Sequence, residues 1–254
     1  MVILVCGDPH GRFEHIVDAA KALKPTAVIL LGDQDAQRPL HDELAPIAEI
    51  VWWIHGNHDT ESESAFANLF DAEAGLRDRN LHGRVVTLPD GEGGGIRIAG
   101  LGGVFRESVW FPGLPGTRGE SKFRSPEEHA RATPRQDRWR GGPHRRHLST
   151  IYPDVVDRLR SERADILVTH EAPSCHPDGF GAIDELGRAL GVRMSFHGHH
   201  HDALDYSVAW GGLGFMAYGV GMQGITAIDA NADVCEVRVV VPGVSDVNSH
   251  RAAK

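Results

Sequence analysis

The chain has 254 residues, of which 41% are hydrophobic and 24% are charged, values typical of a globular protein with a full core and not of a disordered chain. Its formal net charge of −9 excludes a general electrostatic attraction to nucleic acid or to anionic membranes. An anionic substrate would therefore have to be attracted by a local feature, such as metal ions or a basic patch.

The three cysteines, Cys6, Cys175 and Cys235, are widely spaced and form no CxxC pair. This spacing favours neither a disulfide framework nor a zinc knuckle, and it suits a reducing compartment. The chain begins with an apolar strand-like segment instead of a basic leader. No apolar stretch approaches the roughly 20 residues needed to span a bilayer. We therefore expect a cytoplasmic protein that makes no membrane contact.

The first part of the chain alternates predicted strands and helices. Each strand is a short apolar run that ends in glycine and polar residues, and each helix has apolar residues at helical spacing. The predicted strands are 2–6, 27–31 and 51–54, and the predicted helices are 13–23, 41–50 (with an early break at Pro46) and 61–70. This repetition indicates βαβ units in a largely parallel sheet, in which ligands bind beyond the carboxyl ends of the strands.

A second group of strands suggests a second sheet that packs on the first. Its predicted members are 84–88, 96–101, 214–220, 224–229 and 235–241. Between them we predict helices at 151–163 and 180–190, and strands at 165–168 and 192–196. We expect one domain over residues 1–242, followed by a polar tail at 243–254.

Residues 106–147 differ from the rest of the chain in composition. This segment is rich in Pro, Gly and Arg, and it carries 10 Lys and Arg against 5 Asp and Glu, a net charge of +5, whereas the remainder carries −14. One interpretation is a solvated insertion, because charge runs are weak signals of function. The other is a lid that brings positive charge to a phosphate-bearing substrate.

Five groups of polar residues each follow a predicted strand. They are Asp8-Pro9-His10, Gly32-Asp33, Gly56-Asn57-His58-Asp59, His170 and Gly198-His199-His200-His201. Each group alone is a weak or moderate signal, but five in this order, all at strand ends, are hard to explain by chance. Carboxylate, imidazole and amide groups are ligands of borderline divalent cations. Two such ions can activate a water and clamp a phosphate, so the pattern predicts a metal site for phosphate-ester hydrolysis.

The order of these motifs resembles the calcineurin-like metallophosphoesterase superfamily, whose pattern is Asp-x-His, Gly-Asp, Gly-Asn-His-Asp/Glu, His and Gly-His-x-His. The resemblance runs from Asp8 to His201. It implies an α/β fold, a four-layer αββα sandwich of two mixed β-sheets flanked by helices. It also implies two bound divalent ions, for which Mn, Fe and Zn are all suitable.

The resemblance assigns roles to individual residues. One metal is expected at Asp8, His10 and His201, the other at Asn57, His170 and His199, with Asp33 bridging both. The resemblance gives His58 the contact with the phosphate and the protonation of the leaving group, and Asp59 the orientation of His58. Arg106 and His200 are further candidates for substrate binding, and a structural role is the favoured alternative for His200.

The resulting hypothesis is a dinuclear-metal phosphoesterase that hydrolyses a phosphate mono- or diester by attack of a metal-bridging hydroxide. The expected substrate is a small-molecule phosphate ester or a nucleotide, and long nucleic acid is disfavoured by the acidic balance. Within the same class, a nuclease, a nucleotide hydrolase and a protein phosphatase are alternatives, since one fold supports many functions. Two alternatives are not phosphoesterases: a catalytically inactive scaffold for protein partners, and a metal-storage or sensing module.

Overall fold

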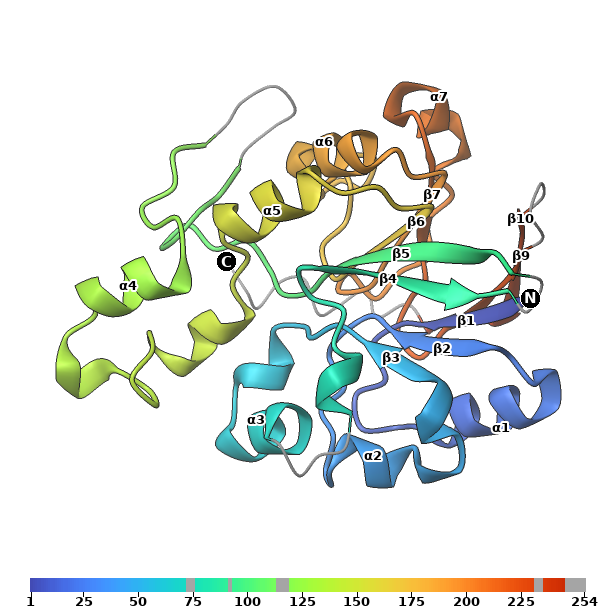
Figure 1. Cartoon of the computed structure of the whole chain (residues 1–254), viewed down its shortest axis with the longest axis horizontal. Coiled ribbons are helices and arrows are strands. Elements are labelled where there is room, and N and C mark those ends of the chain that lie inside the picture. The colour runs from blue at the N-terminus through green and yellow to red at the C-terminus, as the bar shows by residue number, and fades with distance from the viewer. Residues whose placement is uncertain (72–75, 91–92, 113–118, 231–234, 245–254) are drawn as a thin grey trace.

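The computed structural model describes residues 1–71, 76–90, 93–112, 119–230 and 235–244. These residues form a four-layer α/β sandwich, in which two mixed five-stranded sheets lie face to face and helices cover the outer faces (Figure 1). Among the described residues, no helix combines the length and the apolar character needed to cross a membrane.

The first sheet has the strand order β10-β9-β1-β2-β3. Its strands are β1 (Val2–Cys6), β2 (Ala27–Leu30), β3 (Val51–Trp53), β9 (Ile225–Ala230) and β10 (Cys235–Val241). β1, β2 and β3 run parallel, whereas β9 is antiparallel to both β1 and β10. The parallel part agrees with the predicted βαβ units and brings the ends of three strands to one edge.

The second sheet has the strand order β4-β5-β6-β7-β8. Its strands are β4 (Arg84–Pro89), β5 (Gly95–Leu101), β6 (Ile166–Thr169), β7 (Met194–His197) and β8 (Met216–Gly219). β5 to β8 run parallel, and β4 is antiparallel to β5. The carboxyl ends of β6 and β7 therefore also meet at one edge.

The predicted membership of the second sheet is wrong for two strands. β9 and β10 belong to the first sheet, where β9 pairs with β1 from Val2↔Asp229 to Cys6↔Ile225. Their position late in the chain suggested that both strands belong to the second sheet. Strand pairing depends instead on which strand edges still have unbonded backbone groups. β1 is buried and bonds β2 on one side only, so its other edge would leave buried backbone groups unpaired without β9.

The core between the sheets is built from alternate residues of both. Ile3 and Ile29 of the first sheet and Ile98, Val168 and Phe196 of the second belong to one buried cluster. Because side chains alternate across a strand, Leu4 and Val28 face the opposite side, where α1 (Glu14–Leu23) and α2 (Leu40–Glu43) pack. The outer face of the second sheet is covered by α5 (Pro153–Arg160), α6 (Gly181–Leu190) and α7 (Trp210–Leu213).

Two predicted helices are shorter in the structure than the pattern indicates. The segment expected at 41–50 consists of α2 and a separate 3-10 helix, η1 (Ala45–Ile50), because Pro46 lacks the N–H that an α-helix needs there. The helix expected at 151–163 is α5, which begins at Pro153. Tyr152 is extended before this proline, as residues before proline prefer.

The basic insertion packs on its neighbours and contains α4 (Pro126–Ala132) and the 3-10 helix η6 (Arg145–Ser149). Arg140 forms an ion pair with Asp71 at the end of α3 (Glu63–Phe70), and the rings of Trp139 and Phe66 lie 4.6 Å apart. In Figure 1 this segment is the green and yellow-green part beside α3. The predicted tail beyond residue 244 lies outside the described residues.

We expect Phe196→Ala to lower the free energy of unfolding by about 3–5 kcal/mol, because Phe196 is fully buried between the two sheets and the change leaves a cavity. Urea unfolding of the metal-stripped protein measures this loss. Val208→Ala is the control, since Val208 is 96% exposed and its loss should change stability by no more than about 0.5 kcal/mol. An equal effect of the two changes would contradict this packing.

Candidate metal centre

The polar residues of the five sequence motifs come together where parallel strands of both sheets end. Asp8 and His10 follow β1, Asp33 follows β2, and Asn57 follows β3 in the first sheet. His170 follows β6, and His199 and His201 follow β7 in the second. The packing of the two sheets thus builds one site from distant parts of the chain, since His10 and His201 touch across 191 positions.

One cluster of potential metal ligands consists of His10, Asp33 and His201, whose ligand atoms lie within 4.8 Å of one another. The Nε2 atoms of His10 and His201 face each other at 3.0 Å. The other ring nitrogen of His10, Nδ1, lies 2.7 Å from Asp35 Oδ2. A carboxylate at Nδ1 fixes the tautomer that leaves Nε2 to bind a cation, as metal-binding histidines commonly show.

A second cluster consists of Asp33, His170 and His199, again with ligand atoms within 4.8 Å. His170 Nδ1 lies 2.8 Å from the Leu31 carbonyl oxygen, to which it donates its hydrogen. Its Nε2 is therefore left as the nitrogen that could bind a metal ion, and it lies 3.4 Å from Asp33 Oδ2 and 3.3 Å from Asn57 Oδ1. Asp33 belongs to both clusters, so its carboxylate is within reach of the candidate ligand atoms of each.

Asp8 occupies a different position from the other predicted ligands. It is fully buried, and both carboxylate oxygens accept the backbone N–H of His199, at 3.1 and 2.9 Å. It is a member of neither ligand cluster. In this arrangement Asp8 links the β1 loop to the β7 loop and brings negative charge to the edge of the site, 3.7 Å from His170 Nδ1.

The backbone at the site is strained. Asp8, His10, Asp33, His199 and His201 have φ angles of 36°, 45°, 48°, 68° and 56°, a left-handed region that costs free energy for residues with a side chain. Clustering of such residues in one place is characteristic of functional sites, where the surrounding structure holds the strain. The loops after these strands are therefore bent so that their side chains converge.

Two glycines permit the convergence by leaving room for ligands. A Cβ atom on Gly56 would collide with the Asp33 carboxylate, and one on Gly198 would lie 2.6 Å from Asp8 Oδ1. Such separations are below any ordinary van der Waals contact, so larger residues would push the carboxylates out of place. The close approach of these carboxylates to the backbone therefore depends on glycine at both positions.

The electrostatics of the site favour a positive charge beside Asp33. Burial alone would lower the pKa of His170, but Asp33 and Asp8 outweigh it and raise the pKa to about 10. Burial likewise tends to raise the pKa of Asp33, but His170 and its neighbours hold it well below the usual range. Burial raises the pKa of Asp8 to about 7. Buried carboxylates of this kind require a cationic partner.

The donor set fits divalent metal ions. His201 Nδ1 is buried without a hydrogen-bond partner among the described residues. His10 and His170 each have one nitrogen fixed by an oxygen acceptor and the other directed at Asp33 or His201. Carboxylate oxygens and imidazole nitrogens suit Mn, Fe and Zn alike. The residues of both clusters therefore fit a divalent ion.

The role predicted for Asp59 in orienting His58 is wrong. Both Asp59 oxygens are occupied by backbone N–H groups, those of Gln34 and Asp35 on Oδ1 and that of Gly56 on Oδ2. Asp59 thus ties the β2 loop to the β3 loop. The carboxylate beside His58 is Glu61, whose Oε2 lies 3.2 Å from His58 Nδ1. The sequence offered a signal for Glu61, since residues three apart share a face of the helical turn at His58–Thr60.

The two further substrate-binding candidates lie in contrasting surroundings. His200 is 4% exposed and stacks on His176 with ring centroids 3.8 Å apart, a position that favours the structural alternative. Arg106 follows β5 and its Nη2 lies 3.4 Å from the Ser149 hydroxyl. Burial lowers the pKa of Arg106, and Arg146 adds to this, while Glu171, Glu61 and Asp33 oppose it.

The comparisons with known proteins agree with the fold and the motifs. The calcineurin-like phosphoesterase family model matches residues 1–203. The chain belongs to this family. A Haemophilus influenzae protein named only as uncharacterized is 41% identical over 207 residues, which cover 81% of this chain and 85% of that protein. The crystal structure of TT1561 of Thermus thermophilus matches with a TM-score of 0.55 at 15% identity, covering 94% of this chain and 98% of that one; this likeness supports the fold alone.

We expect Gly56→Ala to lower the metal content of the protein, because the new methyl group displaces the Asp33 carboxylate. Metal content per chain after reloading and dialysis, measured by inductively coupled plasma mass spectrometry, provides the readout. Gly212→Ala is the matched control, since a Cβ there meets nothing within 4 Å. Circular dichroism checks that both variants fold. A folded Gly56→Ala protein with wild-type metal content would show that Asp33 is not a ligand.

Proposed function

We propose that this protein is a phosphoesterase that binds two divalent metal ions and hydrolyses a phosphate mono- or diester. The observation that carries the proposal is the buried Asp33 carboxylate, which belongs to two ligand clusters at once. Membership of the calcineurin-like phosphoesterase family supports the same class of reaction.

In this proposal the ions are held by the residues of the two clusters. His10 and His201 bind one ion, His170, His199 and Asn57 bind the other, and Asp33 binds both. Asp8 is proposed to complete the first set from the β1 loop. Two bound divalent ions would supply an activated water and neutralise the charge on the phosphate oxygens.

We assign His58 the role of proton donor to the leaving group. Its side chain is 40% exposed, so a substrate can reach it, and its Nε2 lies 4.0 Å from Asp33 Oδ2 on the side of the ligand clusters. Glu61, whose Oε2 lies 3.2 Å from Nδ1, fixes the orientation of the ring. The backbone N–H of His58 donates to Asp33 Oδ1 at 2.9 Å, which holds the two residues in register.

Arg106 is proposed to bind the phosphate that is cleaved. It is largely enclosed, its Nε lacks a hydrogen-bond partner among the described residues, and Asp33 and Glu61 act on it electrostatically. A guanidinium in such a position can donate two parallel hydrogen bonds to phosphate oxygens. The substrate is expected to be a small molecule or a nucleotide, because a net charge of −9 opposes binding of long nucleic acid.

The scaffold and metal-storage alternatives require the metal clusters but no proton donor. The placement of His58 beside both Asp33 and Glu61 favours catalysis over these alternatives. Turnover by metal-loaded protein discriminates between them.

We expect the metal-stripped protein reloaded with Mn²⁺ to cleave p-nitrophenyl phosphate or bis(p-nitrophenyl) phosphate, and Asp33→Asn to abolish this activity. The preferred ester separates monoesterase from diesterase. The absence of turnover with Mn²⁺, Fe²⁺ and Zn²⁺ would overturn the enzymatic proposal in favour of a metal-binding scaffold.

We expect His58→Ala to lower kcat by about 10²–10⁴, because general acid catalysis contributes that range, while metal content stays at the wild-type level. The control is His41→Ala, since His41 is exposed and its ion-pair partner is the adjacent residue Asp42. Loss of metal from His58→Ala would make His58 a ligand instead of a proton donor. A smaller loss of kcat in Glu61→Gln would fit the orienting role of that residue.

A further inference from the structure

The end of the basic insertion is fixed against the loop that carries Asn57 and His58. Arg145 donates from Nε to the Thr60 carbonyl at 3.1 Å and from Nη2 to the Glu61 carbonyl at 2.7 Å. The hydroxyl groups of Ser149 and Thr60 lie 2.7 Å apart. These contacts hold η6, and with it Arg146, beside the metal centre in a defined position.

Arg106 and Arg146 belong to the same assembly. Arg106 donates to the Ser149 hydroxyl, and that hydroxyl in turn donates to the Arg146 carbonyl at 3.1 Å. Through Thr60, which donates to the Asn57 carbonyl, the contacts extend to the predicted ligand Asn57. Ser149 thus links the Arg106 guanidinium to the backbone of Arg146 at the border between the insertion and the site.

The arginines of this assembly form no direct ion pair among the described residues, although Glu171, Glu61 and Asp33 act on Arg106 electrostatically. Within the part of the chain that the structure describes, no carboxylate oxygen lies within 4.0 Å of a side-chain nitrogen of Arg106, Arg145 or Arg146. Close cations raise one another's energy, so their juxtaposition indicates an anionic ligand.

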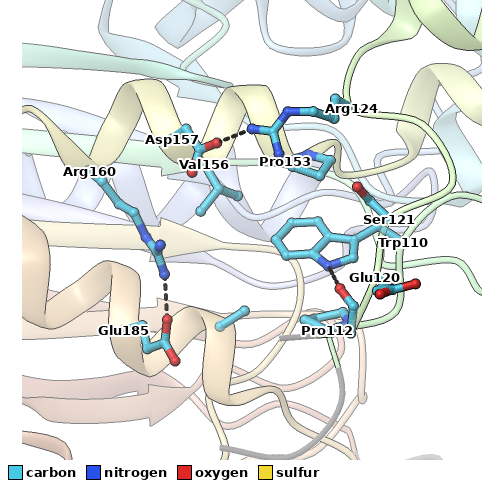
Figure 2. Close-up of a pocket in the computed structure, with 12 residues that line it drawn as sticks. Trp110, Pro112, Glu120, Ser121, Arg124, Pro153, Val156, Asp157, Arg160 and Glu185 are labelled. Carbon is cyan, nitrogen blue, oxygen red and sulfur yellow. Dashed lines mark hydrogen bonds and ion pairs between the residues drawn. The ribbon is translucent and has the colours of Figure 1, made fainter. Parts of the chain in front are cut away.

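Another cavity is lined by arginines that do form ion pairs among the described residues, unlike Arg106, Arg145 and Arg146. It has a volume of about 260 Å³ and lies between the segment around Trp110 and helices α5 and α6 (Figure 2). Its arginines are paired, Arg124 with Asp157 and Arg160 with Glu185. That cavity therefore offers no uncompensated charge to an anion, although it too is lined by the insertion.

Arg146 lines a larger cavity, of about 510 Å³, which is within the size range of small-molecule sites. Aromatic rings form part of its wall, with Phe123 and His129 stacked at 4.2 Å and His147 at 4.6 Å from His129. Asp137 also lines the cavity but forms no ion pair with Arg146. The cavity combines an anion-binding group with flat surfaces for an organic moiety.

Arg146 is the arginine among the described residues that line this cavity, and it contacts one of the cavity's histidines. His147 accepts a hydrogen bond from Arg146 Nε at Nε2, 3.3 Å away. Burial, followed by the neighbouring His129 and Arg146, lowers the pKa of His147 to about 3. Burial and Arg146 also lower the pKa of His129.

We propose that the substrate is a small organic molecule carrying two phosphate groups, of which one is cleaved at the metal centre against Arg106 and the other is bound by Arg146. The carbon skeleton occupies the cavity that Phe123, His129 and His147 line. The inference rests on the proposed phosphoesterase function and names the substrate class of that site. It also assigns the insertion its role, since η6 supplies the binding group for the second phosphate.

The test compares paired substrates that differ by one phosphate. Adenosine 3′,5′-bisphosphate is compared with adenosine 5′-monophosphate, and fructose 1,6-bisphosphate with fructose 6-phosphate, on the Mn²⁺-loaded full chain. The readout is the ratio of kcat/KM within each pair, because a general loss of activity cancels in that ratio. The variants are Arg146→Ala and, as a control, Arg135→Ala, which removes the same charge from an exposed position of the insertion outside the cavity.

We expect at least one bisphosphate to be preferred by about tenfold or more, as one charge-assisted contact can provide. Arg146→Ala should abolish that preference, and Arg135→Ala should keep it. Equal kcat/KM values within both pairs, or a preference that survives Arg146→Ala, would overturn the inference. Cleavage of p-nitrophenyl phosphate in the same experiment would leave the phosphoesterase function intact. Failure to cleave any ester would overturn both.

Discussion

The Asp33 carboxylate, buried where strands of the two sheets end, is the constraint on which the site depends. An ionised carboxylate taken out of water is costly unless cations or hydrogen bonds compensate it. Here the compensation comes from the His58 backbone N–H at 2.9 Å and from imidazoles on either side. Neither the His58 N–H nor the imidazoles compensate the negative charges of both Asp33 and Asp8. The arrangement therefore favours bound cations. The left-handed backbone at the surrounding residues is tolerated because the loops must converge on this one group.

The fold supplies that convergence by packing two sheets so that the carboxyl ends of their parallel strands meet. Four of the proposed ligands follow strands β1 to β3, and the other three follow strands β6 and β7. Asp59 adds a second level of support, because its three backbone contacts hold the β2 and β3 loops together behind the site. The sandwich therefore positions the proposed metal ligands. The insertion at 106–147 is held against it through Arg140 and Arg145 and carries the group that we propose binds the substrate.

The parts of the site that could be predicted from sequence are those encoded by neighbouring residues. Asp-x-His, Gly-Asp and Gly-His-x-His each place side chains within a few positions of a strand end, so apolar runs followed by these residues were enough to predict that the side chains gather. The assignment of strands to sheets could not be predicted in this way. β9 pairs with the free edge of β1, as at Val2↔Asp229, and these two strands lie at opposite ends of the chain. Asp59 was assigned to its neighbour His58, but its partners are amides of other loops, which only the folded chain brings together. Arg146 gave no local signal, since its importance comes from contacts of η6 with Thr60 and Glu61.

The central claim is that two ions share Asp33, and anomalous X-ray diffraction from crystals grown with Mn²⁺ tests it most directly. Two anomalous peaks are expected, one beside His10 and His201 and the other beside His170 and His199, with the Asp33 carboxylate in contact with both. A single peak, or peaks that do not contact Asp33, would contradict the shared site and with it the proposed dinuclear chemistry.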